Sequence, residues 1–433
     1  MGFGGQQVNN WNPWINYNVL QALMLIEKDP ERVRQGVWKL MKSTDFFFSM
    51  YHEDGACDEG PTYWSGASGY ALKFLDLLAK VTGNKVNIFN APLLRNMAQY
   101  IYRVHIGGNY FVNFADSAPK VSPSPGILYR YGELTGDPAM MKFASFMAQQ
   151  NQSFKDGVNG YFASALDELF MYKDIVGHPQ GEPLTGTYWF KDTQICVARD
   201  TEGKSDGFFF AAKGGNNQES HNHNDVGSCI LYYNTLPVLI DAGVGTYTRQ
   251  TFGPERYTIW TMQSDYHNLP LINGTPQKNG REFAAHSQQY KATAKTVSYQ
   301  VDIARAYPQE ANVKSWIRNY TLHRKKDFTI TDKWKLSACN EPSVLNLMTC
   351  CEVEIDRNKN ITLTGEAGRF KVEYDKKLLS PATDTVELTD PKLIHSWNRK
   401  KLTRIRFTIV SQQISGESKL VIKKAQYHKT LND

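Results

Sequence analysis

The spacing of apolar residues along the chain changes near residue 185. Before that point they recur three and four positions apart, as they do on one face of an α-helix. Beyond it they alternate with polar residues in short segments that are rich in β-branched and aromatic side chains. The 433-residue sequence therefore predicts an α+β protein of two domains, helical over residues 1–185 and a large antiparallel β-sandwich over residues 186–433.

The helical domain is predicted to consist of amphipathic helices joined by short polar loops. The expected helices cover residues 14–29, 30–51, 62–83, 91–106 and 138–151. The buried stripe of the first helix is expected to contain Ile15, Val19, Leu20, Leu23 and Ile26. Short loops between consecutive helices favour stacked helical hairpins over a parallel α/β fold.

The β domain is predicted from segments in which the apolar period is two. These segments cover residues 193–200, 206–215, 228–243, 311–324, 327–336, 361–366, 369–375 and 404–412. Turn residues bound each of them, so the connections are short and neighbouring strands are expected to be antiparallel. This pattern is typical of two sheets that pack face to face.

Composition narrows the choice of partners. The 49 basic and 43 acidic residues are mixed, and no dense basic stripe or known module indicates a nucleic-acid partner. No segment approaches the roughly 18 uninterrupted apolar residues of a membrane span. The six cysteines include no CxxC pair, so neither a disulfide framework nor a zinc finger is expected. Residues 1–7 lack the features of a secretory signal, and self-association into a homo-oligomer is left open.

The segment HNHND places two histidines, His221 and His223, two positions apart. Their side chains would share a face if the segment were extended. Asp241 at a predicted strand end and His267 follow along the chain, and two histidines plus a carboxylate are typical of zinc ligation. The residues alone leave four interpretations open, namely a metal site, a catalytic base, both of these together, or loop histidines that form local hydrogen bonds.

Two stretches of the predicted β domain, residues 221–247 and 264–277, resemble the heparinase II/III-like polysaccharide lyases. The resemblance is close over residues 205–280 and looser over the strands that follow. It implies that His221 is catalytic. It also implies that His223, Asp241 and His267 hold one metal ion, which we expect to be a structural zinc rather than calcium.

The helical half carries two further stretches, residues 9–20 and 58–72, that resemble segments of the family's α/α toroid. The resemblance implies that Tyr63 is the catalytic tyrosine and that Asn10 neutralises the substrate carboxylate. For Tyr63, the alternative is a core aromatic. Too few helices are predicted for a complete toroid, so the toroid is expected to be incomplete, either because this variant is short or because the chain is truncated.

Three other residues near these motifs are expected to contact substrate. Trp11 stands where several family members have a histidine, and it can stack on a sugar ring but cannot exchange a proton. Trp64 offers a second aromatic platform. Arg256 could add a bidentate hydrogen bond to a carboxylate, with a surface salt bridge as the alternative.

The resemblance implies a periplasmic or secreted lyase that cleaves a uronic-acid-containing polysaccharide or oligosaccharide, of the glycosaminoglycan or alginate type, by β-elimination. The acidic saccharide is the expected partner. One alternative is a non-catalytic carbohydrate-binding relative that retains the metal site. A metal-dependent hydrolase is disfavoured because its β/α barrel would need alternating helices and strands.

Overall fold

The computed structural model describes residues 8–152 and 162–425, so the predicted absence of a signal in residues 1–7 lies outside the described residues. The chain forms two compact units. A helical unit comprises Met1–Phe111 and Lys120–Pro183, and a β unit comprises Val112–Pro119 and Leu184–Asp433. The predicted α+β class is confirmed.

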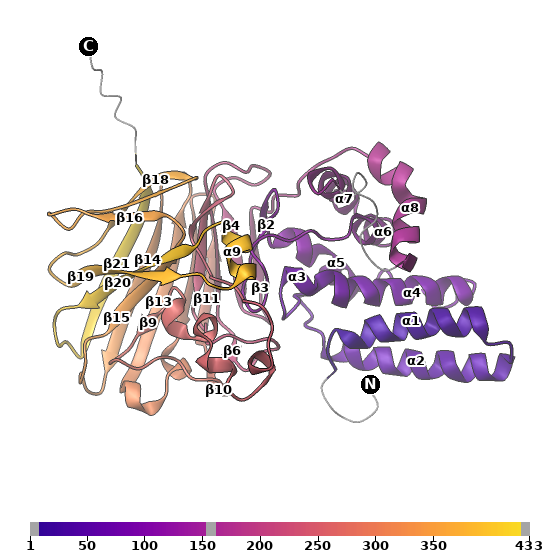
Figure 1. The fold of residues 1–433 in the computed structure, drawn as a ribbon, viewed down its shortest axis with the longest axis horizontal. Coiled ribbons are helices and arrows are strands. Elements are labelled where there is room, and N and C mark those ends of the chain that lie inside the picture. Colours follow the sequence, from indigo (N-terminus) through magenta and orange to yellow (C-terminus); the bar gives the residue numbers. More distant parts are fainter. Residues whose placement is uncertain (1–7, 153–161, 426–433) are drawn as a thin grey trace, which may run out of the picture. The chain divides into compact units, whose positions relative to one another are not determined.

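The helical unit contains eight α-helices among the described residues, and α1, α2 and α4 run side by side (Figure 1). The helices are α1 (Trp11–Ile26), α2 (Pro30–Met50), α3 (Pro61–Trp64), α4 (Tyr70–Val81), α5 (Pro92–Arg103), α6 (Pro125–Thr135), α7 (Pro138–Gln150) and α8 (Phe162–Gly177). A short antiparallel hairpin consists of β1 (His105–Gly107) and β2 (Tyr110–Phe111). None of the helices within the described ranges is long and apolar enough to span a bilayer.

The buried face of α1 agrees with the predicted apolar stripe only in part, since Leu20 is fully buried. Val19 and Ile26 are 45% and 75% exposed. The buried face instead includes Asn12 and Asn16, whose amides each donate to the Ser43 hydroxyl, at 3.1 and 3.0 Å. A buried amide is tolerated where its hydrogen bonds are made, so these polar contacts with α2 decide which face of α1 turns inward.

A π-helical turn, Ser65–Gly69, lies between α3 and α4. Helical backbone therefore continues from Pro61 to Val81, close to the predicted range, but with one wider turn directly after Trp64. Gly69 ends this turn where a Cβ atom would lie 2.9 Å from Cδ1 of Ile127. A larger residue at this position would require the Ile127 side chain of α6 to shift.

The β unit consists of antiparallel strands, one helix and several 3₁₀ turns. Its first strands are β3 (Thr187–Phe190), β4 (Ile195–Arg199), β5 (Phe208–Lys213), β6 (Asn216–Asn217), β7 (Cys229–Tyr233), β8 (Leu236–Leu239), β9 (Pro270–Leu271) and β10 (Gly280–Ala284). The next are β11 (His286–Ala292), β12 (Thr296–Asp302), β13 (Val313–His323), β14 (Asp327–Leu336), β15 (Val344–Thr349) and β16 (Glu352–Ile355). The last are β17 (Ile361–Gly365), β18 (Gly368–Glu373), β19 (Leu379–Glu387), helix α9 (Pro391–Trp397), β20 (Lys401–Ile409) and β21 (Ser415–Lys424).

Three main sheets surround one apolar core. Their strand orders are β3-β4-β5-β7-β8, β11-β12-β13-β14-β21-β18-β17-β16 and β19-β20-β15-β9. A single cluster of buried side chains draws residues from all three sheets. Its largest members include Trp316, Trp334, Tyr299, Tyr320 and Phe328. Burial of this much aromatic surface is the main force that holds the sheets together.

Candidate active site and metal centre

The loop between β6 and β7 carries both histidines of the HNHND segment. This loop is not extended, because His221 has a left-handed backbone with φ of 53°. Such a conformation is uncommon for a residue other than glycine. Side chains two positions apart therefore need not share a face here, and His221 and His223 lie on different sides of one carboxylate.

That carboxylate belongs to Asp116, in the segment Val112–Pro119 that packs within the β unit. One oxygen, Oδ2, lies 2.7 Å from Nδ1 of His221. The other, Oδ1, lies 3.0 Å from Nε2 of His223. Burial opposes the charge of Asp116, but hydrogen bonds from both histidines and the charge of Arg256 hold its pKa well below the ordinary range. Asp116 is therefore ionised and accepts both hydrogen bonds.

An ionised Asp116 fixes which nitrogen of His221 carries the proton. Because the carboxylate can only accept, Nδ1 of His221 is the donor, and Nε2 holds the lone pair of the neutral ring. The side chain of His221 is 23% exposed, so part of the ring reaches solvent. An imidazole oriented by a buried carboxylate is the arrangement of a general base.

Arg256 and Tyr247 complete the surroundings of Asp116. Arg256 Nη2 lies 2.8 Å from Oδ1, and the Tyr247 hydroxyl donates to Oδ2 at 2.9 Å. Arg256 also donates to the carbonyls of Asn222 and Thr251, and its side chain is only 11% exposed. The role of Arg256 as a substrate ligand stays a prediction: each of its guanidinium nitrogens already donates to a protein oxygen, and these three bonds leave two of its five N–H donors.

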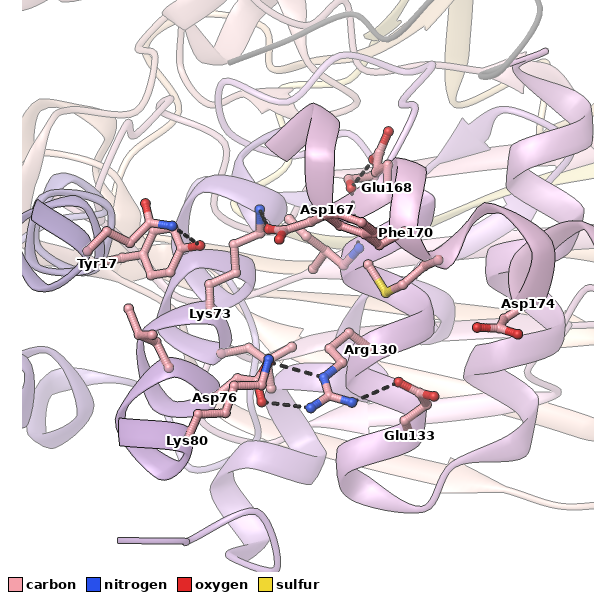
Figure 2. A pocket seen from close by; sticks show the side chains of 17 residues that line it. Tyr17, Lys73, Asp76, Lys80, Arg130, Glu133, Asp167, Glu168, Phe170 and Asp174 are labelled. Carbon is pink, nitrogen blue, oxygen red and sulfur yellow. Dashed lines mark hydrogen bonds and ion pairs between the residues drawn. The ribbon is translucent and has the colours of Figure 1, made fainter. Parts of the chain in front are cut away.

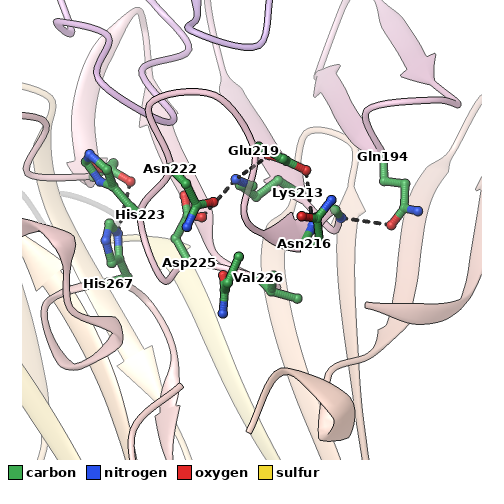
Figure 3. A network of polar contacts seen from close by, with 12 residues as sticks. Gln194, Lys213, Asn216, Glu219, Asn222, His223, Asp225, Val226 and His267 are labelled. Carbon is green, nitrogen blue, oxygen red and sulfur yellow. Dashed lines mark hydrogen bonds and ion pairs between the residues drawn. The ribbon is translucent and has the colours of Figure 1, made fainter. Parts of the chain in front are cut away.

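His223, Asp241 and His267 come together as a possible metal-binding group. All three side chains are fully buried, and one ligand atom of each lies within 4.8 Å of the others. The imidazoles of His223 and His267 lie next to each other, with ring centres 5.5 Å apart (Figure 3). Nδ1 of His267 lies 3.0 Å from Oδ2 of Asp241.

Two nitrogens of this group test whether it fits a metal ion. Nδ1 of His223 and Nε2 of His267 are buried and have no hydrogen-bond partner among the described residues. A buried polar atom without a partner is costly, and a cation bound by lone pairs removes that cost. Asp116 orients His223 through the opposite nitrogen, which is the usual carboxylate support of a metal-bound histidine. The residues present therefore fit a divalent ion.

Hydrogen bonds from neighbouring elements hold the three residues in place. Asp241 follows β8, and its Oδ1 accepts from the Gly243 amide at 2.8 Å. Asn268, next to His267, donates its amide to the carbonyls of Cys229 and Ile240 and accepts from the Met348 amide at 2.7 Å. Asn268 thus joins the ends of β7, β8 and β15 beside the metal-binding group, which explains why an asparagine follows the histidine.

A buried lysine lies beneath the same loop. Lys213, at the end of β5, is 2% exposed and reaches between Asp225 and Glu219, at 2.8 and 3.4 Å (Figure 3). Burial opposes its charge, but the two carboxylates outweigh that effect and raise the pKa of Lys213. Glu219 and Asp225 flank His221 and His223 in sequence, so this ion-pair cluster anchors both sides of the histidine loop.

In the helical unit, the predicted residues have different surroundings. Tyr63 is half-buried in the first turn of α3. Asn10 directly precedes α1 and donates its amide to Glu59 at 2.5 Å. Trp11 is 62% exposed. Trp64 is fully buried, with its indole nitrogen 2.7 Å from the Met97 carbonyl, so the prediction that it contacts substrate is wrong.

A cavity of about 570 Å³ lies among α1, α4, α6 and α8, and none of the predicted site residues lines it (Figure 2). Arg130 pairs with Asp76 at 2.8 Å, and Lys73 pairs with Asp167 at 3.1 Å. The walls of this cavity carry five acidic and three basic side chains. This excess of negative charge does not favour an anionic ligand.

The sequence did not indicate Asp116, Tyr247 or Lys213. Asp116 lies between helices in a short polar segment, and only its proximity to His221 in the fold identifies it. Lys213 ends a strand of apolar residues, and a charged residue directly after FFFAA was the one signal available for it. Tyr247 lies in the stretch that carries the resemblance, but its hydroxyl contact with Asp116 is visible only in the structure.

Comparison with known proteins agrees with these motifs. A family model described as heparinase II/III-like, C-terminal, matches residues 188–423. A search of curated proteins gave no significant match.

Solved structures share the fold at low sequence identity. A heparinase III has a TM-score of 0.72 with 14% identity over 97% of this chain and 60% of that one. The heparan sulfate lyase HepC of Pedobacter heparinus has a TM-score of 0.67 with 15% identity over 98% and 61%. The chondroitin AC lyase of Streptomyces coelicolor A3, in complex with chondroitin sulphate, has a TM-score of 0.54 with 10% identity over 98% and 62%.

This chain thus spans about three fifths of the length of these structures. Identities of 10–15% establish the fold alone. The family model, in contrast, covers more than half of the sequence and includes all the histidines of the candidate site. The chain belongs to the heparinase II/III-like family.

Proposed function

We propose that this chain is a lyase that cleaves a uronate-containing polysaccharide or oligosaccharide by β-elimination. The observation that carries the proposal is the buried Asp116 carboxylate, which orients His221 on one side and supports the metal-binding group on the other. The names of the similar structures, heparinase III, heparan sulfate lyase and chondroitin AC lyase, support the same class of reaction.

The reaction removes a proton from C5 of the uronate and breaks the bond between C4 and the bridging oxygen. The electron pair of the C5–H bond becomes the C4–C5 double bond, and the departing oxygen takes up a proton. Negative charge builds up on the uronate carboxylate as the C5 proton leaves. A hydrogen-bond donor at that carboxylate therefore lowers the barrier.

We assign roles to three residues. His221, with Nδ1 held by Asp116, accepts or returns a proton at Nε2. Tyr63 performs the complementary proton transfer at C5 or at the departing oxygen. Asn10 neutralises the uronate carboxylate, because an amide has two N–H groups and the bond to Glu59 uses one of them.

We further propose that His223, Asp241 and His267 hold one structural zinc ion. Two imidazoles and a carboxylate suit zinc better than calcium, which prefers oxygen ligands. A bound zinc would contribute charge and rigidity beside His221, and none of the proton transfers is assigned to it. An acidic polysaccharide as substrate agrees with a periplasmic or secreted protein, which is part of this proposal.

A panel of uronate polysaccharides tests the reaction. An elimination yields a 4,5-unsaturated uronate that absorbs in the ultraviolet, whereas hydrolysis incorporates solvent oxygen and gives no such absorbance. Tyr63→Phe and His221→Ala should each abolish the absorbance, and Tyr172→Phe, at an exposed tyrosine of α8, is the matched control. Saccharide binding without any cleavage would instead identify a carbohydrate-binding relative.

A further inference from the structure

A groove of about 750 Å³ lies within the β unit, away from the histidine loop. Three turns form most of it, namely those between β4 and β5, between β11 and β12, and between β13 and β14. The volume falls in the range of ligand-binding sites. Threonine hydroxyls contribute to its walls, at Thr187, Thr201 and Thr296.

Four cationic side chains line this groove, namely Lys295, Arg324, Lys325 and Lys326. None of the four forms an ion pair with a carboxylate in the parts of the chain that the structure describes. Two buried cations of the β unit, in contrast, are paired, Lys213 with Asp225 and Arg318 with Asp332. The positive charge of the four groove residues is therefore available to a ligand.

The groove also contains two acidic residues, Asp200 and Glu202. Both oxygens of Asp200 accept from backbone amides, those of Lys325 and Phe208, each at 2.7 Å. Asp200 is thus occupied in shaping the turns. With four cations against two carboxylates, the lining keeps a positive excess.

The turns that carry the cations are fixed by specific hydrogen bonds. The backbone amide of Arg324 donates to the Lys295 carbonyl at 2.9 Å, which joins two of the turns. The Arg324 guanidinium donates through Nη1 to the carbonyls of Arg199 and Asp200. Its Nε is buried without a hydrogen-bond partner among the residues described. The turns and the Arg324 side chain are therefore held in place before any ligand arrives, which reduces the entropic cost of binding.

Strand register separates the groove from the histidine loop. In the pairing of β4 with β5, Arg199 lies opposite Phe209 and Ile195 lies opposite Lys213. The groove is at the Arg199 end, and the Lys213 cluster under the histidines is at the other. Four residues of strand span roughly 13 Å, so a ligand in the groove does not occupy the His221 site.

We propose that this groove is a second binding site for an anionic saccharide segment, whose carboxylate or sulfate groups pair with Lys295, Arg324, Lys325 and Lys326. The identity of the ligand rests on the proposed function above. Arginine and lysine both pair strongly with such groups. A long polysaccharide bound here keeps its other segments at high local concentration near the same molecule.

The test removes the three lysines and spares Arg324, which holds the turns. The variant is Lys295→Ser/Lys325→Ser/Lys326→Ser, and the matched control is Lys371→Ser/Lys377→Ser/Lys419→Ser, which removes the same charge from exposed lysines elsewhere in the β unit. Both are made in a His221→Ala background so that the saccharide is not cleaved. Calorimetry then measures binding of a sulfated and an unsulfated uronate octasaccharide.

The groove variant should bind the octasaccharides about tenfold more weakly at low salt, and the control variant should bind like the parent. Equal losses in both variants would mean that overall charge alone attracts the saccharide, and the proposal would fail. Tighter binding of a single-stranded DNA with the same number of charges would overturn the assignment to saccharides.

Activity of the same variants with His221 intact distinguishes this proposal from the catalytic one. The groove variant should keep its kcat on a tetrasaccharide and show a raised KM on the polymer. If no substrate is cleaved but the groove variant binds saccharide more weakly, the result supports the binding site in the groove and refutes the proposed reaction. If the groove variant cleaves the polymer with the same KM as the parent, the result refutes the binding site in the groove and supports the proposed reaction.

Discussion

Asp116 Oδ2 lies 2.7 Å from Nδ1 of His221, although 105 positions separate the two residues in the sequence. Through its other oxygen, the same carboxylate reaches His223 at 3.0 Å. One buried acid therefore links the candidate base to the candidate metal-binding group. A change at Asp116 should disturb both functions at once, and a change at either histidine should disturb mainly one.

Asp116→Asn should lower the rate of cleavage by about two orders of magnitude, because an amide can donate to His221 and favour the wrong tautomer. The kcat of this variant against that of the wild type is the measurement. Asp384→Asn, at a part-exposed carboxylate of β19, serves as the control. A pH–rate profile that is unchanged in Asp116→Asn would contradict the assignment of His221 as the oriented base.

Acid should remove the stability that Asp116 provides. Its pKa in the folded protein is lowered, so its contribution is fully present above the ordinary aspartate pKa of about 4 and is lost as the pH falls below that value. The difference in unfolding free energy between wild type and Asp116→Asn should therefore shrink between about pH 4 and pH 2. Denaturant titrations across this range measure it, and a difference that grows on acidification would contradict the ionised state.

His223→Ala should lower the melting temperature more than His221→Ala does. A metal ion that binds only the folded protein stabilises it by mass action, and His223 belongs to the metal-binding group whereas His221 does not. Calorimetry of the metal-loaded proteins gives both temperatures, and elemental analysis should find close to one zinc per chain. If the two variants lose the same number of degrees in melting temperature, both before and after a chelator is added, the result would argue against a structural ion.

Lys213→Met should destabilise the β unit by about 3–5 kcal/mol, because it leaves the buried carboxylate of Asp225 and the half-buried one of Glu219 without their cation. Lys80→Met removes the exposed partner of Asp76 and should cost no more than about 1 kcal/mol. Unfolding in denaturant compares the two. If both variants lose a similarly small amount of unfolding free energy, the Lys213 cluster does not anchor the histidine loop.

Alanine substitutions at Trp64 and Trp11 should have different effects, the first on stability and the second on the KM for saccharide. Trp64→Ala is expected to cost about 3–5 kcal/mol of stability, because it empties a fully buried site. Trp11→Ala should change stability little, since its side chain is 62% exposed, and should raise the KM for saccharide if the ring stacks on a sugar. Thermal unfolding and KM, measured on both variants, separate the two roles.

Sequence alone indicated the fold class and the histidine motif because both depend on local patterns. The change of apolar period near residue 185 reflects the two kinds of secondary structure, and His223, Asp241 and His267 lie within 45 positions of one another. Asp116 could not be found this way, because its role arises only from contacts between segments far apart in the sequence.

The wrong predictions share a related cause. The stripe of α1 was drawn from hydrophobicity, whereas Asn12 and Asn16 are buried because Ser43 satisfies their amides. Trp64 has the chemistry of a ligand-binding residue, yet the fold buries it completely and uses it for packing. Residue type shows what a side chain can do, and only its neighbours show what it does.

Ultraviolet absorbance of the products from wild type, Tyr63→Phe and His221→Ala, each incubated with uronate polysaccharides, tests the central claim most directly. We expect the absorbance of a 4,5-unsaturated uronate to rise with the wild type and with Tyr172→Phe. It should be absent with the two active-site variants. Cleavage without that absorbance, accompanied by incorporation of solvent oxygen at the anomeric carbon, would contradict it.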